Sequence, residues 1–498
     1  MNVNPITRLD YPDPDVIRVE DTYYMVSTTM HFMPGCEILQ SFDLVHWEHV
    51  TYVYETLDHT DAQQLKSGQN IYGQGMWAAS LRYHEGRFYI CFVANDTRKT
   101  YLYTSEKIDG PWKKQLIEGF YHDGSLLFDE DGRNYIVYGN DEIWITELNE
   151  DLTAPKKDGL HRLLVSDHKN PELGYEGSHI QKINGYYYIF LVHSLRDRWM
   201  RTEACFYSDS LEGEFTGGDV LCDDRGYCGQ GVAQGGIVDT PDGKWYAMLF
   251  QDSGAVGRIP ILLPVTWKDH FPFFGQNGHV PAEIEVHSTR PGYIYQPLVG
   301  SDDFCNGLLP RWQFNHDPDP RYYHLDALQG TYTITTREVC TELTQAVNTL
   351  TQRMSYPSCA AEVTVDASAL KEGDVAGLCA LQSCYAAVGI TKHHGKYEVL
   401  MLDKKEDGIL DMTEGTVVES HQMDFRLEAD FCNMKDEARC YYRVNKGDWL
   451  PIGTVHKLYF KLDHFTGCRF GLFCYAAEET GGSACFRDFK YYDVDEIS

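Results

Sequence analysis

A five-fold repeat of short strand pairs is the feature that most constrains the fold of this chain. Each copy has a turn, usually with Gly, followed by Tyr within a short apolar run. Another short apolar run precedes every turn. Asp-Gly and Asn-Gly ahead of β-rich runs are signals for tight hairpins. Each copy therefore predicts two antiparallel strands, and the copies are EDTYYMVS at 20–27, EGRFYICF at 85–92, DGRNYIVY at 131–138, NGYYYIFL at 184–191 and DGKWYAML at 242–249.

The spacing of the repeat indicates its architecture. Successive repeat tyrosines are 65, 46, 53 and 58 residues apart, and long helical patterns are hard to find. Units of roughly 50 residues with about four strands each are typical of β-propeller blades. We therefore predict an all-β chain that begins with a five-bladed β-propeller over residues 1–297.

The pattern changes in the last two fifths of the chain. Strand-like runs continue there, but the tyrosine–turn repeat is lost. We expect a β-sandwich domain over residues 298–498. A sixth and a seventh blade are the alternative interpretation of this region.

Charge and composition limit the classes of molecule that this chain could bind and the compartment in which it could function. The formal net charge of −31 would repel nucleic acid and anionic membranes, so we expect neither as a partner. The start, MNVNPITRLDYPDPD, lacks the basic and apolar regions of a secretory signal. The 15 cysteines form an odd number without a CxxC pair, which favours a reduced, cytoplasmic protein. The mature form of an exported protein is the alternative. The 34 tyrosines also suit surfaces that stack on sugar rings.

Polar residues occupy equivalent positions ahead of the five repeats. Counting back twelve residues from each repeat tyrosine, or eleven in the first copy, leads to the start of the preceding strand. The innermost strands of a propeller line its channel, so these starts converge at one mouth. Three carboxylates there would suit glycoside hydrolysis, in which one carboxyl group protonates the leaving oxygen and another activates water. The residues at these positions are Asp13, Trp77, Asp123, Glu176 and Gln234.

Several ordered motifs resemble glycoside hydrolase family 43. They are YPDPDVIRV at 11–19, YHDGSLLFDEDG at 121–132 and GYEGSHIQKINGYYYIF at 174–190, together with HFMPG, SFDLVHWE, GMWAAS and VDTPDGKWY. NTLTQR at 348–353 resembles the concanavalin-A-like β-sandwich that follows the catalytic domain in β-xylosidase and α-L-arabinofuranosidase members. The resemblance covers essentially the whole chain.

The resemblance implies a role for each carboxylate. Asp13 would be the general base, and Glu176 the general acid. Asp123 would set the pKa of the acid and help to orient it. Each residue also has an ordinary alternative, because Asp13 and Asp123 could simply form turns and Glu176 could be a surface acid.

The resemblance also implies binding residues. Arg258 would contact sugar hydroxyls, while Trp77 and Phe32 would form walls of the pocket; the alternatives are a structural salt bridge for Arg258 and a core position for Trp77. Many relatives have Pro two residues after this Trp, where this chain has Ala79. Many also carry a channel His that coordinates calcium or water, and here the matching position is Gln234. A Gln oxygen could ligate a structural Ca²⁺, although the chemistry itself needs no metal.

We therefore expect an inverting exo-glycosidase that removes terminal pentose units from hemicellulose oligosaccharides. β-1,4-Xylosidase activity is the first expectation, with α-L-arabinofuranosidase activity beside it or as the main activity. The partner would be a pentose-containing oligosaccharide, and assembly into a homo-oligomer stays open. A non-catalytic carbohydrate-binding propeller and a structural or protein-interaction propeller are the alternatives from other classes.

Overall fold

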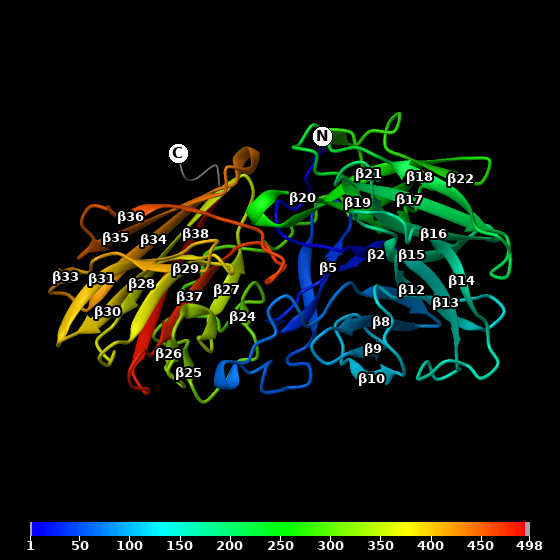
Figure 1. The fold of residues 1–498 in the computed structure, drawn as a ribbon. Helices are drawn as coiled ribbons and strands as arrows, with labels where there is room; N and C mark the ends of the chain where they lie inside the picture. Colours follow the sequence, from blue (N-terminus) through cyan, green and yellow to red (C-terminus); the bar gives the residue numbers. More distant parts are fainter. Residues whose placement is uncertain (1, 494–498) are drawn as a thin grey trace.

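The computed structural model describes residues 2–493 as two β domains that lie side by side (Figure 1). Within this range the chain forms strands and short 3-10 helices but no α-helix. The 3-10 helices are η1 (Lys66–Gly68), η2 (Gly254–Val256), η3 (Leu343–Gln345) and η4 (Cys432–Met434). None of these described helices has the length and apolar character needed to cross a bilayer.

The N-terminal domain is the predicted five-bladed propeller, with four antiparallel strands in each blade. The first blade contains β2 (Asp15–Val19), β3 (Thr22–Val26), β5 (Gly35–Ser41) and β6 (Glu48–Tyr54), and the second contains β7 (Ser80–His84), β8 (Arg87–Ala94), β9 (Lys99–Ser105) and β10 (Lys113–Ile117). The third contains β11 (Ser125–Phe128), β12 (Asn134–Asn140), β13 (Glu142–Leu148) and β14 (His161–Ser166), and the fourth contains β15 (Glu176–Ile183), β16 (Tyr186–Ser194), β17 (Arg201–Ser208) and β18 (Thr216–Leu221). The fifth contains β19 (Val232–Asp239), β20 (Trp245–Asp252), β21 (Arg258–Lys268) and β22 (Phe271–Phe274).

The first strand of each blade is the innermost one. Strands β2, β7, β11, β15 and β19 contact one another in sequence, and β19 returns to β2, so they form a closed ring. The five repeat tyrosines all lie on the second strands, as the hairpin pattern predicts. The short strand β1 (Asn2–Val3), which precedes the first blade, pairs with β23 (Glu283–Ile284), which follows the last blade.

The C-terminal domain is a sandwich of two antiparallel sheets, which excludes additional blades. Its core lies between the sheets and includes Trp312, Phe425 and Phe486. One sheet contains β24 (Gln313–Asn315), β27 (Leu350–Arg353), β29 (Val375–Leu381), β30 (Ala386–His393), β31 (Lys396–Lys404), β32 (Leu410–Met412), β33 (Thr416–Val418) and β37 (Arg469–Tyr475). The other contains β25 (Tyr323–Asp326), β26 (Thr331–Thr335), β28 (Ser358–Asp366), β34 (Gln422–Asp430), β35 (Glu437–Val444), β36 (Leu450–Lys457) and β38 (Ser483–Asp493).

The two domains share a sheet. The short strand β4 (Phe32–Met33) leaves the first blade and pairs with β24, so a propeller segment completes the edge of the sandwich. Along the chain, the last blade ends at Phe274 and β24 begins at Gln313. The boundary predicted between residues 297 and 298 falls in the connection between these strands.

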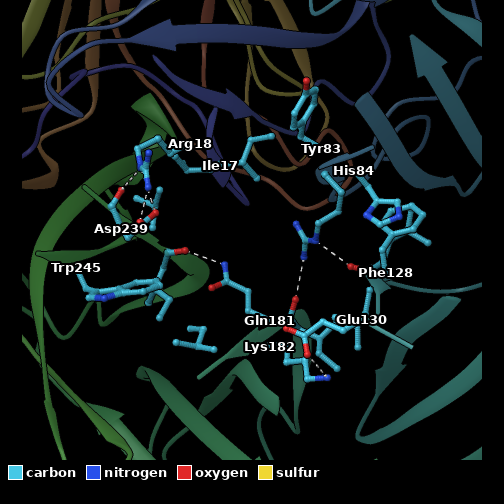
Figure 2. A pocket seen from close by; sticks show the side chains of 18 residues that line it. Ile17, Arg18, Tyr83, His84, Phe128, Glu130, Gln181, Lys182, Asp239 and Trp245 are labelled. Atoms are coloured by element: carbon cyan, nitrogen blue, oxygen red, sulfur yellow. Dashed lines mark hydrogen bonds and ion pairs between the residues drawn. The ribbon is translucent and has the colours of Figure 1, made fainter. Parts of the chain in front are cut away.

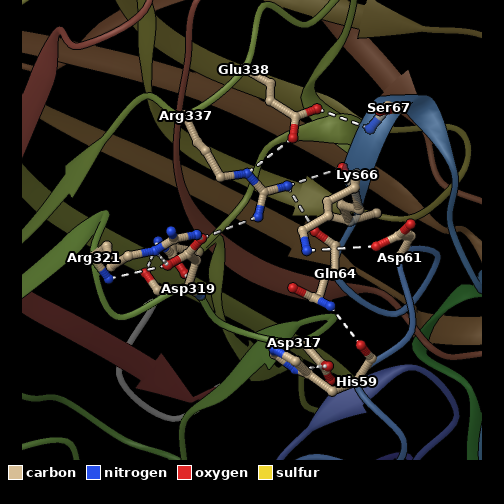
Figure 3. A network of polar contacts seen from close by, with 12 residues as sticks. His59, Asp61, Gln64, Lys66, Ser67, Asp317, Asp319, Arg321, Arg337 and Glu338 are labelled. Carbon is tan, nitrogen blue, oxygen red and sulfur yellow. Dashed lines mark hydrogen bonds and ion pairs between the residues drawn. The ribbon is translucent and has the colours of Figure 1, made fainter.

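A polar network fastens the long loop between β6 and β7 to the sandwich (Figure 3). The His59 ring lies 2.8 Å from Asp317 Oδ2, and Arg337 donates a hydrogen bond to the carbonyl oxygen of Gln64 at 2.8 Å. The Ser67 backbone N–H donates to Glu338 Oε2 at 3.0 Å. Because several partners hold the loop, the sandwich is a fixed neighbour of the propeller.

A buried ion pair also crosses the interface. Glu37 of the propeller lies 2.8 Å from Arg353 of the sandwich, and both side chains are almost fully buried. Burial alone would raise the pKa of Glu37, but Arg353 and His49 lower it to about 2. The carboxylate is therefore ionised and depends on its arginine.

Candidate active site

The three predicted carboxylates lie at the starts of inner strands. Asp13 and Asp123 each precede their strand by two residues, and Glu176 is the first residue of β15. The backbones of Asp13 and Asp123 have φ values of 52° and 48°, in the left-handed region. Aspartate tolerates this conformation better than most residues, and such strain is often found at functional sites. Since the inner strands form one ring, these starts meet at a single mouth.

Asp123 and Glu176 form a close cluster with His122. One ligand atom from each of the three side chains lies within 4.8 Å of the others. His122 Nε2 lies 3.5 Å from Asp123 Oδ2 and 3.6 Å from Glu176 Oε2. Asn140 donates a hydrogen bond to Glu176 Oε2 at 2.8 Å. The Gly177 N–H donates to Asp123 Oδ2 at 3.0 Å, so Asp123 fixes the backbone directly beside Glu176.

The charges of this cluster shift the pKa values within it. Burial raises the pKa of Asp123 to about 6, with further contributions from Glu176 and Asp13 and an opposing one from His122. Burial alone would lower the pKa of His122, but the nearby carboxylates raise it to about 9. The imidazole therefore keeps its positive charge at neutral pH. We interpret this group as an ion cluster in which the imidazolium offsets the charge of the two carboxyl groups.

Asp13 is held by two side chains. Thr28 donates a hydrogen bond to Asp13 Oδ2 at 2.6 Å, and Arg258 donates to Asp13 Oδ1 at 3.1 Å. The Asp13 and Arg258 side chains are both more than nine-tenths buried. These two donors leave little rotational freedom to the carboxylate, an arrangement that would suit a group that activates water.

A loop of the sandwich completes the wall of the site. The Phe465 ring lies 4.5 Å from the Arg258 guanidinium carbon and 5.5 Å from the Trp77 ring. On its other side, the Trp77 ring lies 5.9 Å from that of His122. Asp10 fixes this loop to the propeller, because its carboxylate accepts hydrogen bonds from the N–H groups of Arg258 and Gly467. Trp77 and Arg258 are thus brought together with the carboxylates, as predicted.

A second polar group blocks the channel below the carboxylates. The Asp15 side chain is fully buried and accepts hydrogen bonds from Arg82 at 2.8 Å and from the Leu81 N–H at 2.7 Å. Its other oxygen lies 3.1 Å from His179 Nδ1. Burial would raise the pKa of Asp15, but Arg82 and His179 lower it to about 2. Side chains from three inner strands, β2, β7 and β15, therefore meet across the ring; we call Asp15, Arg82 and His179 the channel plug.

Phe32 lies on the short strand that joins the two domains. Its side chain is only 2% exposed, and its ring packs against the Arg469 guanidinium at 3.4 Å and against the His31 ring at 4.3 Å. Phe32 belongs to β4, so these contacts place it in the interface between the domains. The role of Phe32 as a pocket wall stays a prediction.

Gln234 lies beside the carboxylates but in a poor setting for calcium. Its backbone N–H donates to Glu203 Oε2 at 2.7 Å, and its side chain lies against Gly177. Burial disfavours the charged form of Glu203 and raises its pKa well above the ordinary value. Ca²⁺ takes six to eight oxygen ligands, often including carboxylates. These neighbours do not fit that donor set, and a cation at Gln234 stays a prediction.

Four contributors to the site were not predicted from the sequence. His122 and Asn140 contact Glu176, Thr28 holds Asp13, and Phe465 covers Arg258. His122 stands next to a predicted residue in the same motif, which is the one signal that could have found it. Counting back from the repeat tyrosines selects one residue per blade and cannot reach the other three.

Comparison with known proteins gives consistent results. A beta-xylosidase of Formosa agariphila is 26% identical over 554 residues, covering 99% of this chain and 89% of that protein. A non-reducing end alpha-L-arabinofuranosidase of Bacteroides ovatus is 24% identical, covering 82% and 79%. Among solved structures, a bifunctional GH43-CE protein of Bacteroides eggerthii superposes with a TM-score of 0.93 and 42% identity. That match covers 99% of this chain and 64% of the longer one.

Two family patterns match the two domains. The C-terminal concanavalin A-like domain of beta xylosidases matches residues 301–492, within the sandwich. Glycosyl hydrolases family 43 matches residues 3–272, which is more than half of the chain and extends from before the first blade into the last strand of the fifth. The propeller with its three carboxylates therefore makes this chain a member of glycoside hydrolase family 43.

Proposed function

We propose that this glycoside hydrolase is an inverting exo-enzyme that removes single terminal pentose units from hemicellulose oligosaccharides. The observation that carries the proposal is that buried polar groups lie beneath the carboxylates while a loop of the sandwich packs against Arg258. The channel plug lies beneath the carboxylates, and Phe465 covers Arg258 from the side. A site closed below and narrowed at one side accommodates a chain end better than the middle of a polymer.

The contacts support distinct roles for the three carboxylates. Asp13, oriented by Thr28 and Arg258, is suited to activate water as general base. Glu176, oriented by Asn140, is suited to protonate the leaving oxygen. Asp123 is the positioning partner, because it binds the N–H next to Glu176 and lies within the same cluster. Inversion requires a base and an acid on opposite faces of the sugar.

We propose β-1,4-xylosidase as the first activity and α-L-arabinofuranosidase as the second. Relatives along most of the chain carry both names, the Formosa agariphila protein as a beta-xylosidase and the Bacteroides ovatus protein as an arabinofuranosidase. The two pentoses can present similar hydroxyl groups to a pocket built on one arginine and aromatic rings.

The test is release of 4-nitrophenol from the β-D-xylopyranoside and the α-L-arabinofuranoside. Asp13→Ala and Glu176→Ala are measured beside the wild-type protein. We expect hydrolysis of at least one substrate and its loss in both variants, and the ratio of rates identifies the preferred sugar. Hydrolysis that survives in both variants would overturn the assignment of the carboxylates.

Two further measurements separate the alternatives. Glu176→Gln keeps the shape of the side chain, so it should retain sugar binding but lose turnover. A non-catalytic carbohydrate-binding propeller instead predicts binding without hydrolysis in the wild type. Proton NMR of the first product formed tests the stereochemistry, since an inverting enzyme releases the opposite anomer and a retaining enzyme would release the same one.

A further inference from the structure

A second hollow lies at the other mouth of the propeller channel (Figure 2). Its volume is about 460 Å³, within the range of about 300–1,000 Å³ that is usual for small-molecule sites. The lining comes from the far ends of all five inner strands and from the start of β20. The carboxylates stand at the opposite ends of the same inner strands, so the two sites are on opposite faces of the propeller.

The channel plug separates this hollow from the carboxylates. Arg82 belongs to both, because it lines the hollow and donates to Asp15 within the plug. Arg82 also donates hydrogen bonds to Ser125 Oγ at 2.7 Å and to the Leu126 carbonyl oxygen at 2.8 Å. With its donors used in this way, Arg82 closes the floor of the hollow. A molecule bound there would not reach the catalytic groups.

The charged groups of the hollow neutralise one another. Arg18 pairs with Asp239, whose Oδ1 lies 3.2 Å from Arg18 Nε. Lys182 lies 2.6 Å from Asp129 and 3.2 Å from Glu130. Each described cation of the hollow is thus matched by a carboxylate, which leaves no excess positive charge for an anion. A neutral ligand with many hydroxyl groups can still bond to the free edges of these pairs.

Aromatic and amide groups provide the remaining surface. Tyr83 is 45% exposed, and the His84 and Phe128 rings stack at 4.6 Å on neighbouring blades. Trp245 stands across the hollow from them (Figure 2). The Gln181 side-chain amide donates to the Ile237 carbonyl oxygen at 2.7 Å, which leaves its own oxygen as an acceptor. Rings that pack on C–H faces, combined with paired polar groups, suit a sugar.

We propose that this hollow is a second, non-catalytic binding site for a neutral saccharide, and specifically for a pentose oligosaccharide. The site would hold oligosaccharide on the face opposite the catalytic mouth and raise its concentration around the enzyme. The choice of a pentose oligosaccharide rests on the proposed function, but not on which pentose the catalytic site cleaves. It requires binding at a place where no hydrolysis occurs.

The experiment is titration calorimetry of the Glu176→Gln protein with xylotetraose, and with the corresponding arabinan oligomer as a second probe. We expect two binding sites per chain. Tyr83→Ala and, separately, Ile17→Trp, which fills the hollow, should remove one of them or weaken it at least tenfold. Phe273→Ala is the matched control, because Phe273 is 50% exposed on β22 but does not line the hollow.

The outcomes are decisive in both directions. Thermal unfolding of each variant shows that it is folded, so lost binding cannot be ascribed to misfolding. One site per chain, unchanged in Tyr83→Ala and Ile17→Trp, would overturn the proposal and leave the hollow filled with solvent. If the protein binds oligosaccharide at a single site and Tyr83→Ala and Ile17→Trp abolish that binding, the proposed function is wrong but the proposal of a binding site in the hollow is supported.

Discussion

Replacing Asp123 by Asn should make the propeller more stable at alkaline pH, at the expense of catalysis. Burial and the neighbouring carboxylates raise the pKa of Asp123 from 3.8 to about 6. A difference of about two pKa units corresponds to about 3 kcal/mol at about 1.4 kcal/mol per unit. Ionisation of Asp123 therefore lowers the stability of the folded protein by this amount. Asparagine has the same shape without the charge, so the variant avoids this loss.

The pH dependence follows from the direction of the shift. Because the pKa of this carboxyl group is raised on folding, its favourable contribution is complete below pH 3.8 and is lost as the pH rises through about 6. We therefore expect the variant to gain about 3 kcal/mol at pH 8 but less than about 1 kcal/mol at pH 4. For a domain of this size the gain at pH 8 would raise Tm by about 5 °C.

The assay is thermal unfolding of both proteins at pH 8 and pH 4, followed by near-ultraviolet circular dichroism. Asp15→Asn is the matched control, because the pKa of Asp15 is lowered to about 2. Its contribution is present above pH 3.8 and lost only as the pH falls through about 2, so this variant should lose at least about 2 kcal/mol at both pH values. An Asp123→Asn protein that is no more stable than the wild type at pH 8, or equally stabilised at both pH values, would refute the reasoning.

Three further predictions concern the surroundings of the site. Gly177→Ala would place a Cβ atom 2.7 Å from Gln234 Cγ at a residue whose φ is +65°. We expect the backbone conformation alone to lower the free energy of unfolding by about 1–2 kcal/mol, and displacement of the neighbouring Glu176 to lower kcat. Unchanged kinetics would show that the position of Glu176 is not disturbed. Arg353→Met should lower the free energy of unfolding by about 3–5 kcal/mol, because it leaves Glu37 as a buried charge without its arginine. In thermal unfolding, adding Glu37→Gln to this variant should restore part of the lost stability. If the effects of the two substitutions are simply additive, the two side chains are not coupled. His122→Asn removes a positive charge that lies beside Glu176 and Asp123, so the alkaline limb of its pH–rate profile should differ from that of the wild-type protein. An identical alkaline limb in both proteins would exclude a role for the His122 charge.

Local sequence signals predicted the propeller well because its repeating unit is local. The hairpin turn at Asn184-Gly185 and its four counterparts determine where each second strand begins, and each blade is built from strands that follow one another in the chain, apart from β4 in the first blade. The starts of the inner strands are equivalent by topology, so Asp13, Asp123 and Glu176 could be grouped although they are far apart in sequence.

The interface between the domains could not be predicted in the same way. Arg353 and Glu37 meet across more than 300 residues, and β4 has only two residues, too few for any periodic pattern. The pairing of Phe32 with the sandwich through β4 could therefore not be predicted from the sequence. Phe465 was missed for the related reason that it comes from a loop of the other domain and has no counterpart in the repeat.

The channel plug also limits the paths by which reaction products can leave the enzyme. Since Asp15, Arg82 and His179 fill the middle of the ring, a sugar cannot leave through the far side of the propeller. Under the proposed exo-action, the shortened oligosaccharide and the released monosaccharide would share a single exit. The outer product therefore departs first, and the sugar at the closed end departs last, so the free monosaccharide should compete directly with incoming substrate and accumulate as an inhibitor during prolonged digestion.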